Sequence, residues 1–311
     1  MKKRNVIAAL GVAAAAEFLT AVYFYRRTMM RGRAKVERTM KMAGTDWGQY
    51  ADLLAKRKEY FLSQPHEDVW ITSGDGLKLH GTFFPNRGSK RVVLCFHGYT
   101  SEGMKDYIGL SDYYLRRGFA MLLAAERAHG LSEGKYIGFG CLDRRDAEKW
   151  IAWIINHCQE DVKIILHGTS MGAATVLMAS GLKLPKQVKG IVSDCGFTSP
   201  KEVFTHVLHS MYHIPAFPII QIADWMNKKL AGYGMDECNA VREVKKSTTP
   251  TLFIHGDADT FVPSRMCDAM YENCSAEKWK LIVKGAAHAE SYYKNTKRYE
   301  EALGIFIKEI L

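Results

Sequence analysis

The chain has 311 residues, of which 47% are hydrophobic and 24% are charged. These values are typical of one large globular domain with a buried core, and they exclude an intrinsically disordered chain. Most of the net charge of +10 lies in residues 1–60, where 13 Lys and Arg stand against 5 Asp and Glu and leave +8. The rest of the chain carries only +2, so we predict no nucleic-acid partner.

The amino-terminal segment contains a long apolar run with basic residues on both sides. Residues 6–25 are interrupted only by Glu17 and Thr20, and as a helix they would be about 30 Å long, enough to cross a bilayer. We therefore predict a single-pass membrane anchor within residues 1–30, with the catalytic domain in the cytoplasm because the larger basic cluster follows the run. A secretory signal cleaved after the small residues 14–16 is the alternative, although the apolar run continues beyond them.

Two further segments precede the main domain pattern. Residues 31–66 are basic and have the character of a partly helical linker. Residues 68–84 form two alternating runs around Gly74 and Gly76, which predicts an antiparallel hairpin. The seven cysteines lack CxxC spacing, so we expect free thiols, as in a reducing compartment.

Beyond the hairpin, short apolar runs alternate with amphipathic segments. Residues 144–157, for example, place Ala147, Trp150, Ile151 and Ile154 on one face of a helix. This alternation predicts an α/β fold with a mostly parallel sheet covered by helices on both faces, and a site at the carboxyl ends of its strands. The predicted strands lie in residues 91–98, 119–126, 162–168, 189–196, 250–257 and 279–285.

The strongest chemical motif follows the run at 162–168. Ser170 lies between Gly168 and Gly172, with a predicted strand before it and an Ala-rich helix after it. A sharp turn between strand and helix needs glycines at close backbone approaches, and it exposes the serine hydroxyl above the sheet. We therefore predict that Ser170 is a nucleophile.

A serine hydroxyl needs a base, an orienting acid and donors for the developing oxyanion. His288, beyond the last strand, is the predicted base. Asp259 and Asp257 both follow the penultimate strand, and we choose Asp259 because it lies further into the loop. The backbone N–H groups of Met171 and Tyr99 are the predicted oxyanion donors, since one follows the nucleophile and the other follows an early strand.

At this point the sequence resembles the α/β-hydrolase family, in particular its bacterial esterase, lipase and serine-aminopeptidase-like branches. The resemblance covers about residues 67–311 and rests on "FHGYTSEG", "ERAHGLSEG", "HGTSMGAA", "HGDADTFVP" and "GAAHAES". It implies a sheet of about eight strands, a triad of Ser170, Asp259 and His288, and no cofactor. Membrane-anchored members of the family look most similar to this chain.

A long insertion at about residues 197–248 predicts a small helical cap over the site. Its apolar side chains, with the residue that ends the preceding strand, are candidates for the substrate pocket. They are Cys195, Phe197, Met211, Phe217 and Trp225. His206, His209 and His213 share a helix face but lack further ligands, so we predict no metal.

These features together predict a serine hydrolase that cleaves a small-molecule carboxylic ester through an acyl-enzyme. A serine peptidase or aminopeptidase-like amide hydrolase is the alternative enzyme, and Glu102, Glu126 or Glu133 would then bind a substrate amino group. A catalytically silent binding protein on the same fold is the alternative from another class.

Overall fold

The computed structural model of the protein describes residues 3–32, 44–86, 88–158 and 160–311, with side chains of the first helix from residue 11 onward. An eight-stranded sheet lies at its centre, in the order β1-β2-β4-β3-β5-β6-β7-β8. The pairs β1/β2 and β2/β4 are antiparallel, whereas all pairs from β4 to β8 are parallel. The predicted mostly parallel sheet is therefore confirmed. The strands are β1 (Glu67–Thr72), β2 (Lys78–Phe84), β3 (Arg91–Phe96), β4 (Ala120–Ala124), β5 (Lys163–Thr169), β6 (Val188–Asp194), β7 (Thr251–Gly256) and β8 (Lys278–Val283).

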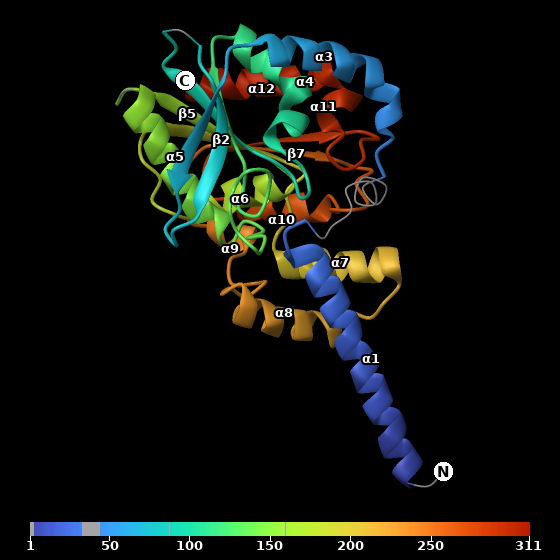
Figure 1. Cartoon of the computed structure of the whole chain (residues 1–311). Helices are drawn as coiled ribbons and strands as arrows, with labels where there is room; N and C mark the ends of the chain where they lie inside the picture. The colour runs from blue at the N-terminus through green and yellow to red at the C-terminus, as the bar shows by residue number, and fades with distance from the viewer. Residues whose placement is uncertain (1–2, 33–43, 87, 159) are drawn as a thin grey trace.

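Helices cover both faces of this sheet (Figure 1). On one face, α3, α4 and α12 bury an aromatic-rich core that includes Phe61, Tyr114 and Phe306. On the other face, α5, α6 and α10 bury Trp150 and Leu177 among others. The helices of the body are η1 (Trp47–Tyr50), α3 (Ala51–Ser63), α4 (Gly103–Arg116), α5 (Asp143–Cys158), α6 (Met171–Ala179), α9 (Ala240–Val244), α10 (Arg265–Asn273), α11 (Ser291–Lys294) and α12 (Thr296–Ile310).

The chain between β6 and β7 contains the predicted cap segment. Its helices α7 (Pro200–Tyr212) and α8 (Ile219–Leu230) lie together beyond one end of the sheet (Figure 1). Helix α8 turns Ile219, Ile220 and Ala223 inward, since these residues recur on one helical face. Helix α9, in contrast, packs against α6 and α10 in the body of the domain.

The linker predicted over residues 31–66 is helical in its second half. Residues 33–43 of it lie outside the described residues. In α3, the ring of Phe61 stacks on Phe84 with centroids 4.4 Å apart, and Arg57 Nη1 donates to Gly109 O at 2.8 Å. This segment is therefore built into the face of the domain that α4 covers.

The first helix, α1 (Lys3–Met29), corrects the localisation that we predicted. Across the portion of the chain whose placement is described, no helix has the length and apolar character needed to span a bilayer, so the predicted single-pass anchor is wrong. The carboxyl-terminal half of α1 is instead buried against the rest of the protein. Ala21, Tyr25 and Met29 recur every four residues and pack on the domain, while the amino-terminal half runs outward past α7 and α8 (Figure 1).

Candidate active site

Ser170 occupies the tight turn between β5 and α6. Its backbone is in a strained conformation, with φ 54° and ψ −109°, and its N–H donates to Asp194 O at 2.8 Å. A Cβ on Gly168 would collide with the Gly172 carbonyl, and a Cβ on Gly172 would collide with the Phe96 carbonyl. The two glycines thus allow the strand and helix to approach closely enough to hold the serine in this turn.

The structure brings the three predicted triad side chains together from three loops. Ser170 Oγ lies 2.8 Å from His288 Nε2, and His288 Nδ1 lies 2.7 Å from Asp259 Oδ2. Since a carboxylate faces Nδ1, the proton of the neutral imidazole belongs on Nδ1, and Nε2 accepts from the serine hydroxyl. Asp257, the alternative acid, accepts instead from Gly285 N at 2.6 Å and closes the neighbouring turn.

Asp259 is held as a buried carboxylate by several donors. Its Oδ1 accepts from the backbone N–H groups of Phe261 and Val262, at 3.0 and 2.8 Å. Burial alone would raise the pKa of Asp259, but the adjacent His288 and His255 imidazoles hold it well below its usual range. Asp259 therefore stays ionised and can stabilise positive charge on His288.

His255 is a part of the site that sequence reasoning missed. The side chain is fully buried at the end of β7, with Nε2 2.8 Å from Val262 O and 3.3 Å from Asp259 Oδ2. Two oxygen acceptors on one side require that Nε2 carries a proton. Burial alone would lower the pKa of His255, but its contact with Asp259 raises it to about 10. This imidazole contacts the same carboxylate oxygen, Asp259 Oδ2, that faces His288.

The two predicted oxyanion donors lie beside Ser170. A Cβ built on Gly98 would lie 3.5 Å from Ser170 Cβ, so the Gly98–Tyr99 turn borders the nucleophile. Gly98 N donates to Asp106 and Thr100 N to His129, whereas Tyr99 N has no acceptor among the described residues. Met171 is the first residue of α6, where a backbone N–H has no partner within its helix.

A buried polar network supports the turn from below. His167 accepts or donates at both ring nitrogens, with Tyr114 Oη 2.9 Å from Nδ1 and Tyr299 Oη 3.3 Å from Nε2. Tyr299 Oη also donates to Asp194 Oδ2 at 3.0 Å, and the Asp194 carbonyl is the acceptor for Ser170 N. Burial lowers the pKa of His167 to about 3, so this imidazole stays neutral. No member of this network is predicted from the sequence.

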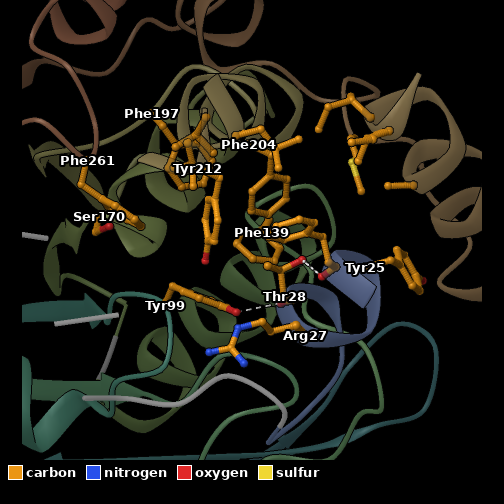
Figure 2. A pocket seen from close by; sticks show the side chains of 18 residues that line it. Tyr25, Arg27, Thr28, Tyr99, Phe139, Ser170, Phe197, Phe204, Tyr212 and Phe261 are labelled. Atoms are coloured by element: carbon orange, nitrogen blue, oxygen red, sulfur yellow. Dashed lines mark hydrogen bonds between the residues drawn. The ribbon is translucent and has the colours of Figure 1, made fainter. Parts of the chain in front are cut away.

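Two cavities meet at Ser170. One has a volume of about 90 Å³ and is almost wholly apolar (Figure 2). The other has a volume of about 490 Å³ and also contains Lys58, Lys105 and Asp106. Ser170, Tyr99 and Phe261 line both of them.

The predicted pocket residues need correction. Only Phe197 of the five lines a cavity at Ser170, while Cys195 and Met211 line neither cavity. Phe217 and Trp225 are 74% and 56% exposed, because Phe217 precedes α8 and Trp225 lies on its outer face. The cap contributes other side chains, among them Phe204, Val207 and Ile220.

The three glutamates suggested for binding an amino group lie elsewhere. Glu102 forms a 3.0 Å ion pair with Lys105, and Glu133 Oε2 accepts from Lys78 N at 2.8 Å. Glu126 is buried, accepts a hydrogen bond from Thr175 Oγ1 and lines neither cavity. Burial, followed by the nearby Asp143 carboxyl, raises the pKa of Glu126 well above its usual value, so its side chain is held as the neutral acid.

A stability measurement tests this protonation state. The folded protein keeps the Glu126 proton at pH values above the unfolded pKa of about 4.3. The unfolding free energy therefore falls as pH rises from about 4.3 toward the folded pKa. In that window, wild-type unfolding free energy should fall relative to Glu126→Gln by about 1.4 kcal/mol per pH unit. Urea denaturation at pH 5 and pH 8 measures the difference. The exposed Glu59→Gln variant is the control, and a Glu126→Gln profile parallel to wild type would contradict the neutral side chain.

Comparison with known proteins agrees with this fold. The model of the prolyl oligopeptidase family matches residues 142–311, and that of the X-Pro dipeptidyl-peptidase (S15) family matches residues 25–217. The uncharacterized protein YqkD of Bacillus subtilis is 27% identical over 237 residues, which cover 76% of this chain and 77% of YqkD.

Two solved esterase structures share the fold. A Pyrococcus furiosus esterase superposes with a TM-score of 0.65 at 23% identity, over 81% of this chain and 93% of the esterase. An acetyl xylan esterase from Paenibacillus sp. R4 gives a TM-score of 0.61 at 16% identity, over 86% and 95%. Because each of the two family models covers more than half of the chain and the fold agrees, the chain belongs to the α/β-hydrolase family of enzymes, among those described by the prolyl oligopeptidase and X-Pro dipeptidyl-peptidase models.

Proposed function

We propose that this enzyme is a serine hydrolase that cleaves carboxylic esters through an acyl-enzyme intermediate. The observation that carries the proposal is the continuous hydrogen-bonded chain from Ser170 through His288 to Asp259, with contacts of 2.8 and 2.7 Å. A nucleophile, a base and an orienting acid in this order are what acyl transfer at neutral pH requires.

Each group has a defined role in the proposed reaction. His288 Nε2 takes the proton of Ser170 as Oγ attacks the ester carbonyl, and Asp259 stabilises the resulting imidazolium. The oxyanion forms beside the N–H groups of Tyr99 and Met171. The imidazolium then protonates the ester oxygen as its bond to the acyl carbon breaks, so that it leaves as the alcohol. A water molecule activated by His288 hydrolyses the acyl-enzyme to acid and free serine.

Cleavage of a peptide bond is the second candidate, since both matching family models describe peptidases. The chemistry of the cavities favours an ester. Asp106 is the carboxylate in the larger cavity, and both its oxygens are already engaged, by Gly98 N and by Ser101 Oγ. A substrate amino group would therefore have to compete with bonds that hold the Gly98–Tyr99 turn.

Active-site labelling tests the nucleophile. A fluorophosphonate should modify the native protein, should fail on Ser170→Ala, and should still modify Ser210→Ala, which alters an exposed serine of α7 that lines neither cavity. Equal labelling of Ser170→Ala and wild type would overturn the assignment. Turnover of aryl acetates against aminoacyl arylamides then separates the two candidates, and faster amide turnover would favour the peptidase.

A further inference from the structure

The two cavities at Ser170 differ in their relation to the proposed base. His288 lines the larger cavity and does not line the smaller one. In acyl transfer the same imidazole that accepts the serine proton must deliver it to the leaving oxygen, so the leaving alcohol has to lie on the side of His288. The acyl group, attached across the carbonyl carbon, is then directed into the smaller cavity.

The smaller cavity is suited to an apolar group of limited length. Its volume is about 90 Å³, and its lining is dominated by aromatic and aliphatic side chains from the cap, from the body and from α1 (Figure 2). A dry apolar cavity of about 150 Å³ accommodates benzene, so this one has room for about four acyl carbons. Arg27 of α1 is the charged side chain in a lining whose exposed surface is otherwise mostly apolar.

One wall of the smaller cavity is formed by α1, the helix that contains the predicted membrane anchor. Phe24, Tyr25 and Thr28 of α1 line it. The Phe24 ring meets Tyr212 of α7 edge to face, with centroids 4.8 Å apart. In Figure 2, Thr28 lies beside Tyr99, on the side of the cavity away from Phe197.

Hydrogen bonds fix this wall in place. Tyr25 Oη donates to Asn227 Oδ1 of α8 at 3.3 Å, and Tyr99 Oη donates to the Thr28 carbonyl at 3.0 Å. At the end of the helix, Ile137 N donates to Met29 O at 2.9 Å. The wall is thus joined to the cap, to the turn beside Ser170 and to the body of the domain.

We propose that the smaller cavity is the acyl site for short acyl groups of up to about four carbons, and that Phe24 of α1 sets the length limit. The larger cavity receives the alcohol part of the ester. This inference rests on the proposed esterase function, because it takes the direction of bond cleavage from the role of His288.

A series of aryl esters with acyl groups of two to ten carbons tests the acyl site in the full-length protein. For wild type, kcat/KM should be greatest at or below four carbons. In Phe24→Ala the ratio of kcat/KM for hexanoate to that for butanoate should rise about tenfold, since each well-packed methylene discriminates by at least this order. Phe18→Ala removes the same ring from an exposed position of the same helix and should leave the ratio unchanged.

Two further variants separate packing defects from specificity. Ala223→Leu fills the smaller cavity from α8 and should lower kcat/KM for butanoate relative to acetate about tenfold. This variant tests the acyl site independently if Phe24→Ala fails to fold. Leu54→Ala widens the larger cavity and should change the preference among alcohols at a fixed acyl group.

Unchanged chain-length profiles in Phe24→Ala and Ala223→Leu, with Ser170-dependent labelling intact, would overturn the acyl site and leave the proposed function standing. A chain-length response in Leu54→Ala, instead of an alcohol response, would reverse the assignment of the two cavities and equally overturn the inference. Equal labelling of wild type and Ser170→Ala would instead contradict the proposed serine hydrolase function itself.

Discussion

Replacing Asp259 with asparagine should lower kcat for an ester substrate by about 10⁴-fold while the protein remains folded. The amide can present its NH₂ group to His288 Nδ1, which favours the wrong tautomer and leaves Nε2 protonated against Ser170 Oγ. A neutral amide also fails to stabilise the imidazolium. Steady-state kinetics at saturating aryl acetate measure the effect, and circular dichroism confirms the fold.

The neighbouring residue provides a matched control for this experiment. Asp257→Asn makes the same chemical change two positions away, where the side chain accepts from Gly285 N and does not touch an imidazole. Its oxygen can keep that bond, so kcat should stay within a few-fold of wild type. Comparable losses in both variants would contradict the assignment of Asp259 as the orienting acid.

Replacing Gly172 with alanine should abolish stable folding or cost more than about 4 kcal/mol of unfolding free energy. The added Cβ would collide with the Phe96 carbonyl oxygen and carbonyl carbon, which are backbone atoms of β3 and cannot rotate away. Relief would require separating α6 from the sheet, which would open the core beneath Ser170. Thermal unfolding followed by circular dichroism measures the loss.

A glycine in open space provides the comparison for Gly172. Gly74 lies in the β1–β2 hairpin with no atom within 4 Å of an added Cβ, so Gly74→Ala should change stability by less than about 1 kcal/mol. A Gly172→Ala protein with the wild-type unfolding temperature would show that α6 and β3 can move apart freely. That outcome would contradict the close packing assigned to this turn.

The sheet and the serine turn could be predicted because each leaves a local mark on the sequence. Buried parallel strands need continuous apolar runs, and a tight strand-to-helix turn needs glycines such as Gly168 and Gly172. The carboxyl ends of such strands share one edge, which is why His288 and Asp259 could be chosen before the geometry was known.

The missing parts of the site depend on tertiary packing alone. His255 stands in an apolar run, and nothing local indicates that its ring would turn toward Asp259. Phe217 and Trp225 were chosen as apolar residues of the cap, but Ile219 and Ile220 determine which face of α8 turns inward. For α1, an apolar run of this length is compatible with burial in lipid or in a groove of the protein. The four-residue spacing of its buried side chains identifies the packed face only once the position of the domain is known.

The hydrogen bond from Tyr99 to the Thr28 carbonyl has a practical consequence for recombinant preparations. Expression designs commonly delete an amino-terminal apolar stretch to improve yield. A protein begun after Met29 would lose this tether and would also lose the α1 side chains that line the smaller cavity. Kinetic constants from such a truncated protein would describe a remodelled cleft, so the full-length enzyme is the appropriate starting material for substrate profiling.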